Sequence, residues 1–155
     1  ANAGPESSSI ADIYFDDSGS GILAALALID DSDPGVSFSA GANPGNLPGA
    51  NNADPVFKTT INMLVDSDPP VQKNGVNPGE SLGIVMDLAS GPSYQDVLDQ
   101  LNGGTLRIGL HVQGFDSGGS EGFVTGPPVP APGSVLLGTV GLLVVRGLRQ
   151  RRVVV

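Results

Sequence analysis

The chain has 155 residues, of which 39% are hydrophobic and 15% charged, with 23 glycines, 13 prolines and no cysteine. This composition is too apolar for a disordered chain, and it excludes disulfides, thiolate metal sites and cysteine nucleophiles. All sixteen acidic residues and three of the seven basic residues lie at or before Glu121. The chain up to Glu121 therefore carries a formal charge of −13, and the rest of the chain carries +4. Nucleic-acid binding needs a basic surface, so we expect no nucleic-acid partner for so acidic a body.

The first half of the chain predicts short strands separated by turn-rich segments. The apolar segments 10–15 and 22–29 end at Asp, Ser and Gly residues, and 36–40 alternates between apolar and small polar residues. Both patterns are typical of strands bounded by turns. Asn-Pro-Gly and Leu-Pro-Gly steps predict a loop over 41–55, and moderate alternation predicts another strand over 57–65.

The second half predicts further strands and one helix. Asp-Pro-Pro, Asn-Gly and Asn-Pro-Gly steps predict a second loop over 66–79, after which 81–88 alternates as a strand. Ser93 followed by an acidic residue three positions later resembles a capping box, and apolar residues then repeat at helical spacing, so 93–101 is predicted to be helical. The clearest alternating strand covers 106–112, and a last strand begins near Phe123.

These elements predict a mainly β fold: an antiparallel β-sandwich or jelly-roll-like body over 1–125, with one short helix. Ala1–Ser9 is small and polar and lacks the basic and apolar regions of a signal peptide, so we expect the body to lack its N-terminal start. A proline-rich linker follows over 126–132. The segment 133–155 is predicted to form a single hydrophobic helix with a basic end.

The end of the chain combines an uncharged apolar run with an arginine cluster. The uncharged apolar run covers 133–145. As a helix it would span about 20 Å, less than the ~30 Å hydrocarbon core of a bilayer. The predicted membrane helix comprises Val135, Leu136, Leu137, Val140, Leu142, Leu143, Val144 and Val145. The predicted basic stop comprises Arg146, Arg149, Arg151 and Arg152. By the positive-inside rule the arginines would stay cytoplasmic and the acidic body outside.

This order of a Pro-x-Pro motif, a short apolar helix and arginines resembles the PEP-CTERM sorting signal. The motif here is Val129-Pro130-Ala131-Pro132, so Ala131 stands where that family usually has Glu. The resemblance implies recognition and removal of the tail by an exosortase-type membrane protease, after a transient stay in the inner membrane of a Gram-negative cell. The segments 37–49, 74–83 and 106–115 also resemble secreted proteins that carry this tail, a group linked to envelope and biofilm-matrix roles.

Candidate catalytic and metal-binding residues are few. His111, the single histidine, lies in the alternating strand on the face opposite to that of Leu110 and Val112. We expect it to be structural, since a lone histidine forms no transition-metal site. Carboxylates crowded in turns suit calcium, which takes hard oxygen ligands. The calcium candidates are Asp30, Asp31, Asp33, Asp66 and Asp68.

We therefore expect a non-enzymatic exported protein: a membrane-anchored precursor that ends at the cell surface or in the extracellular matrix. The first alternative is a calcium-dependent carbohydrate-binding module, with an extracellular polysaccharide as its partner. The second is a carboxylate-based hydrolase, which requires two carboxylates that converge in a cleft. Apart from calcium, no cofactor is expected.

Overall fold

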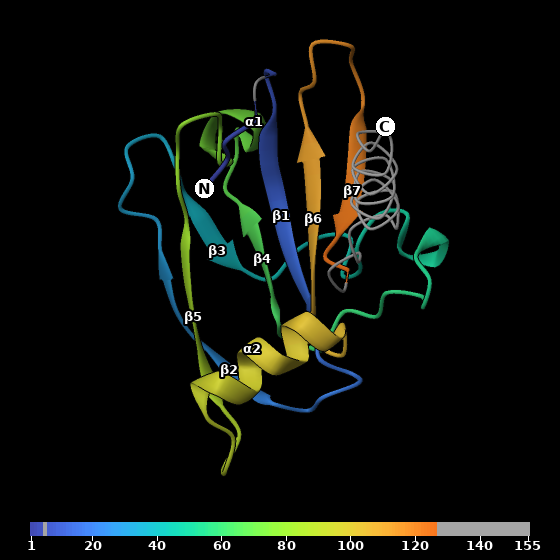
Figure 1. The fold of residues 1–155 in the computed structure, drawn as a ribbon. Coiled ribbons are helices and arrows are strands. Elements are labelled where there is room, and N and C mark those ends of the chain that lie inside the picture. Colours follow the sequence, from blue (N-terminus) through green and yellow to red (C-terminus); the bar gives the residue numbers. More distant parts are fainter. Residues whose placement is uncertain (5, 127–155) are drawn as a thin grey trace, which may run out of the picture.

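The computed structural model describes residues 1–4 and 6–126, which form a mainly β structure with antiparallel sheets (Figure 1). The strands are β1 (Ser9–Asp16), β2 (Leu23–Asp30), β3 (Phe38–Ala40), β4 (Leu64–Ser67), β5 (Gly83–Leu88), β6 (Arg107–Gln113) and β7 (Ser120–Val124). The helices are the 3-10 turn η1 (Ala50–Asn52), the four-residue α1 (Val71–Asn74) and the longer α2 (Tyr94–Gly103).

One sheet has five strands in the order β3-β4-β1-β6-β7, so β1 lies at its centre. β1 pairs antiparallel with β4 and with β6, and the register places Asp12 opposite both Asp66 and His111. Because successive side chains of a strand point to opposite faces, Ile13 and Phe15 face one side of this sheet. The residues between and beside them face the other.

The inner face of the five-stranded sheet packs against the two-stranded sheet of β2 and β5. Its core contains Ile13, Phe15, Val36, Phe38, Met63, Val65 and Val76, all buried. Apolar residues of β2 and β5 pack on this core, among them Leu26, Ile29, Ile84 and Met86. The strand predicted over 10–15 is confirmed by β1, and the predicted alternation in 106–112 is confirmed because Ile108 and Leu110 of β6 join the same side.

A second core lies on the outer face, where irregular chain rather than a sheet covers β1, β4 and β6. It consists of Tyr14, Leu47, Ala50, Phe57 and Leu64, with Ala42, Ala53 and Val124 packed against it. Gly109 of β6 provides the space for this cover, because a Cβ there would lie 2.9 Å from the ring of Phe57. The segment predicted as a loop over 41–55 therefore packs on the outer face of the sheet and buries part of it.

α2 closes the end of the molecule toward which β1 and β5 run (Figure 1). Ser93 and Asp96 form the predicted capping box, in which each residue's side chain accepts a hydrogen bond from the backbone N–H of the other. Gly104 ends the helix in the left-handed conformation, with φ of 73°. The predicted helix is confirmed, together with its start.

The strand predicted over 57–65 is wrong for most of its length. β4 begins only at Leu64, because Asn62 has a positive φ of 64° and the Phe57 amide bonds back to Ala50. The predicted loop over 66–79 contains the end of β4 and the short helix α1.

Among residues 1–4 and 6–126, no helix has the length and hydrophobicity needed to cross a bilayer. The predicted motif 129–132, the apolar helix within 133–145 and the arginine cluster lie outside the described residues.

Candidate functional site

A row of polar side chains crosses the outer face of the five-stranded sheet. Asp66 of β4, Asp12 of β1 and His111 of β6 occupy directly paired positions on three adjacent strands. The Nδ1 atom of His111 lies 2.7 Å from Oδ2 of Asp12. The Gln113 amide nitrogen lies 3.5 Å from the same imidazole atom. The fold thus joins residues that are 99 positions apart in sequence.

Burial differs along this row. The Asp12 side chain is 6% exposed and that of His111 12%, whereas Asp66 is only half-buried. A buried carboxylate needs a hydrogen-bond partner, and the imidazole supplies one. Asp12 is therefore the anchored member of the row, and Asp66 is the member that solvent reaches.

The carboxyl group of Asp12 affects the ionisation of Asp66. Burial, the charge of Asp12 and a hydrogen bond shared with Asp12 raise the pKa of Asp66 to about 6. Burial and the charges of Asp12 and Asp66 also raise the pKa of Tyr14, whose hydroxyl donates to the Pro44 carbonyl over 3.0 Å. A neighbouring like charge disfavours the ionised form of a carboxyl group, so Asp66 holds its proton to a higher pH than an isolated aspartate.

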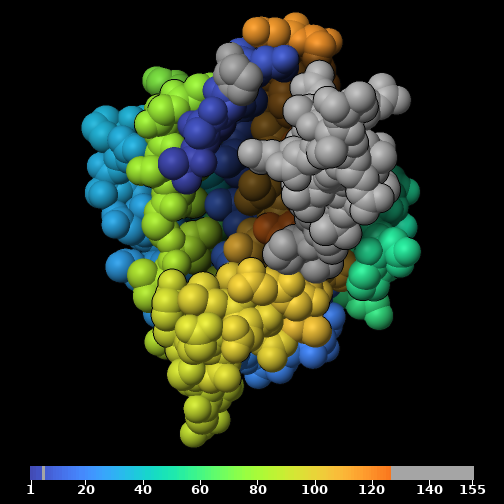
Figure 2. All heavy atoms as spheres, viewed as in Figure 1, coloured from blue at the N-terminus to red at the C-terminus, as the bar shows by residue number. Residues whose placement is uncertain are grey.

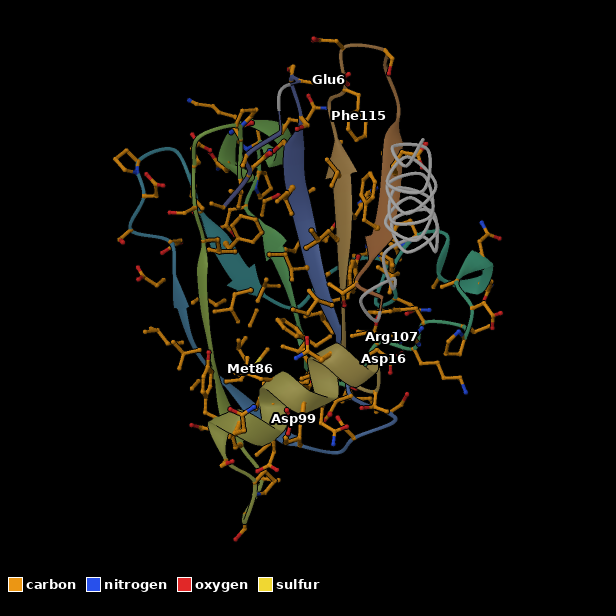
Figure 3. The ribbon with its side chains drawn as sticks, viewed as in Figure 1. Glu6, Asp16, Met86, Asp99, Arg107 and Phe115 are labelled. Atoms are coloured by element: carbon orange, nitrogen blue, oxygen red, sulfur yellow. The ribbon has the colours of Figure 1, made fainter. Side chains whose placement is uncertain are left out.

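A buried ion pair lies further along the same face. Nη2 of Arg107 lies 2.5 Å from Oδ2 of Asp16, with side-chain exposures of 8% and 2% (Figure 3). Burial alone would raise the pKa of Asp16, but hydrogen bonds from Ser18, the Lys58 amide and Arg107 outweigh it and lower the pKa. Arg107 also donates to the carbonyls of Pro55 and Val56. The pair fastens the covering segment to β1 and β6.

Of the five calcium candidates, Asp30 ends β2 and Asp66 lies in β4, and the other three lie in the segments that follow these two strands. Asp31 accepts from the Phe38 amide, and Asp33 accepts from the amide and hydroxyl of Ser81. Asp68 accepts from the hydroxyls of Ser37 and Ser39, which lower its pKa. In the described part of the chain, no three His, Cys, Asp or Glu side chains gather in an arrangement that could hold a metal ion. Calcium binding stays a prediction.

The hollows of the described surface lie away from the polar row. One, of about 770 Å³, lies between β2 and the chain at 40–45 and 59–64. A second, about 310 Å³, is enclosed by β5, α2 and the adjoining ends of β1 and β6. Asp12, Asp66 and His111 line neither of them.

The sequence prediction assigned no site to Asp12, which is a single carboxylate within an apolar strand, or to Asp16, which with Asp17 was interpreted as the turn that ends this strand. A signal was present, since a strand that carries Asp12, Tyr14 and Asp16 at alternate positions has one polar face. Which partners meet that face depends on strand order and register, and the pattern of one strand does not contain this information.

Comparison of the chain with family models, with curated proteins and with solved structures gives no match. The site is therefore interpreted from its own geometry.

Proposed function

We propose that this protein is a non-enzymatic exported protein of the cell envelope or biofilm matrix, delivered by a removable C-terminal sorting signal. The observation that carries the proposal is the order of the proline-rich segment 126–132, the uncharged apolar run and the four arginines, placed directly after β7. In this proposal the two antiparallel sheets form a jelly-roll-like sandwich that is the exported body. An exosortase-type protease of the inner membrane acts at Val129–Pro132.

The charge distribution supports this orientation. The part up to Glu121 carries −13 and the end of the chain +4. Cytoplasmic retention of arginines beside an apolar run is the usual determinant of membrane orientation. The acidic body would then lie outside the cytoplasm, held by a helix that is shorter than a typical spanning helix. A short helix of this kind suits a transient anchor.

Mass spectrometry of the protein from its native host tests the processing step. We expect mature molecules that end within or near Val129–Pro132 and a precursor in the membrane fraction. Replacing Pro130 and Pro132 by Ala should make the precursor accumulate, whereas replacing Pro127 and Pro128 in the same segment should not. Molecules that all extend through Val155 would contradict the proposal.

A second candidate function, carboxylate-based hydrolysis, rests on the paired positions of Asp12 and Asp66 on neighbouring strands. It also requires a cleft beside them, and neither residue lines the described hollows. A carboxyl group that is protonated below about pH 6 can act there as a general acid while a neighbouring carboxylate acts as base or nucleophile. Asp66→Asn should abolish hydrolysis of a polysaccharide by the purified chain, and the control Asp68→Asn should retain it. No hydrolysis by the unaltered chain removes this candidate.

The calcium-dependent carbohydrate-binding alternative has a separate test. It predicts that calcium raises the melting temperature and that a chelator reverses the change. If Asp33 is a calcium ligand, Asp33→Asn should lose this rise in melting temperature. A melting temperature of the unaltered chain that calcium does not change removes the alternative.

A further inference from the structure

The end of β7 is fastened to β6 by the residue that follows the strand. The Thr125 amide donates to the Ile108 carbonyl over 2.9 Å, and the Ile108 amide donates to the Thr125 hydroxyl over 2.8 Å. These two hydrogen bonds continue the pairing of β6 and β7 past the pair formed by Gly109 and Val124. The Val124 side chain also packs against the outer core. The folded body therefore holds the chain as far as Thr125.

The chain leaves the sheet within a recess rather than at an open edge. A hollow of about 460 Å³ has residues 124–126 as one wall. Its other walls include 53–55 of the covering segment and the glycines Gly103 and Gly104 at the end of α2. Figure 2 shows both of these segments at the surface, with α2 in yellow at the lower end and the covering segment in green at the right edge. A protein that approaches residues 124–126 meets these walls first.

The sequence after Gly126 explains why the pairing with β6 stops at Thr125. Prolines occupy positions 127, 128, 130 and 132, and a proline has no backbone N–H to donate to a neighbouring strand. Val129, the start of the predicted recognition motif, follows Thr125 by only four positions. Proteins that recognise an extended peptide commonly bind its backbone over several residues. Recognition of Val129–Pro132 would therefore involve residues that reach back to the fastened end of β7.

We propose that release of Thr125 from Ile108 controls the rate at which the C-terminal tail is processed. This inference rests on the proposed function, since it takes Val129–Pro132 as the recognition motif. While Thr125 is fastened, residues 124–126 stay in the recess and the motif is too close to the body to enter the cleft of a protease. When the end of β7 detaches, these residues lengthen the accessible segment. Cleavage that needs a locally opened state follows the population of that state when opening is fast.

A linker insertion in the full chain tests this control without altering the body. A Gly-Ser linker of about six residues is placed between Gly126 and Pro127, and pulse–chase labelling in the native host follows the loss of precursor mass. We expect processing about fivefold faster or more, because the motif then reaches the protease while Thr125 stays fastened. The same linker between Gly118 and Gly119, where an added Cβ meets nothing within 4 Å, is the control and should leave the rate unchanged.

The outcomes separate this inference from the proposed function. If the unaltered chain and the chain with the linker after Gly126 are processed at the same rate, the inference is overturned and the sorting function stands. Equal acceleration by the two linkers also overturns it, since the position of the linker would then not matter. If none of the chains is processed, the proposed function fails and the inference fails with it.

A matched pair of substitutions tests the role of the Thr125 hydroxyl. Thr125→Val keeps the shape of the side chain but removes the acceptor for the Ile108 amide. It should speed processing by about threefold and speed hydrogen exchange of the Ile108 amide. The control Thr59→Val also removes one exposed hydroxyl hydrogen bond, to the side chain of Asn46, and should change neither rate. Equal processing of the two variants contradicts a controlling role for Thr125.

Discussion

The two faces of the five-stranded sheet are covered in different ways. On the inner face, side chains of β2 and β5 interdigitate with Ile13 and Phe15 in an entirely apolar core. On the outer face, the irregular segment 41–63 covers Tyr14, and it is held by a buried ion pair and close glycine contacts. An apolar core tolerates substitutions that conserve side-chain volume. The segment 41–63 depends on single hydrogen bonds and close backbone contacts, which such substitutions can remove or block. The outer face should therefore be the more sensitive one to small substitutions.

The largest effect is expected when the outer core loses its central ring. Phe57 is fully buried although it lies outside any strand. Phe57→Ala should lower the free energy of unfolding by about 4 kcal/mol, because it removes apolar contacts and leaves a cavity. Urea unfolding followed by circular dichroism measures the change. Val56→Ala, at a side chain 43% exposed, is the control and should change stability by less than about 0.5 kcal/mol.

The next largest effect is expected at the buried ion pair. Arg107→Met leaves the Asp16 carboxylate without its cation and removes donors to the Pro55 and Val56 carbonyls. Loss of one partner from a buried pair costs about 3 kcal/mol. Lys58→Met is the control, since Lys58 contacts Asp16 through its backbone amide. If both variants unfold at the same urea concentration, the ion pair does not fasten the cover.

Adding one methyl group tests the close contact between β7 and the covering segment 41–63. A Cβ at Gly122 would lie 2.3 Å from the Pro48 carbonyl oxygen, so Gly122→Ala must displace backbone. We expect a loss of about 2 kcal/mol, typical of overpacking. At Gly45 a Cβ meets nothing within 4 Å, and Gly45→Ala should be close to neutral. Equal urea midpoints for the two variants would show that the cover yields at Pro48.

The smallest effect concerns pH and the polar row. The pKa of Asp66 is raised to about 6 in the folded chain, above its ordinary value. The folded state therefore binds this proton more tightly than the unfolded state, so stability falls as pH rises from about 4 to about 6 and is level above that. Asp66→Asn should remove this fall and stabilise the protein at pH 8 by about 1 kcal/mol, after allowance for solvent screening.

Asp68 changes stability with pH in the direction opposite to Asp66. Hydrogen bonds from Ser37 and Ser39 lower the pKa of Asp68, so its contribution is present at neutral pH and is lost on acidification. Asp68→Asn should therefore leave the fall between pH 4 and 6 in place. Thermal unfolding at half-unit pH intervals measures both slopes, and a fall that persists in Asp66→Asn would assign it to another group.

Local signals in the sequence predicted most of the described strands and the helix α2. Alternation identified 81–88 and 106–112, and the capping box located the start of α2. The segment 57–63 was mispredicted because Phe57 and Met63 are apolar for packing reasons, on different cores, and not because they share a strand. Periodicity cannot separate these two causes.

The polar row and the ion pair depend on contacts that only the fold provides. His111 was correctly placed on the face opposite Leu110, but its partner Asp12 comes from a strand 99 residues earlier. Arg107 and Asp16 are 91 residues apart. Pairings at such separations follow from strand order, which no local pattern specifies.

The central place of β1 has a consequence for how the chain folds as it emerges. β1 precedes the other described strands, yet its two neighbours are β4 and β6, so it must wait until Gln113 has been made before its second edge is paired. Sheets that close through distant pairings fold slowly. The β3-β4-β1 half of the sheet can pair once Ser67 has been made, whereas β6 and β7 can join it only when nearly all of the described residues have appeared.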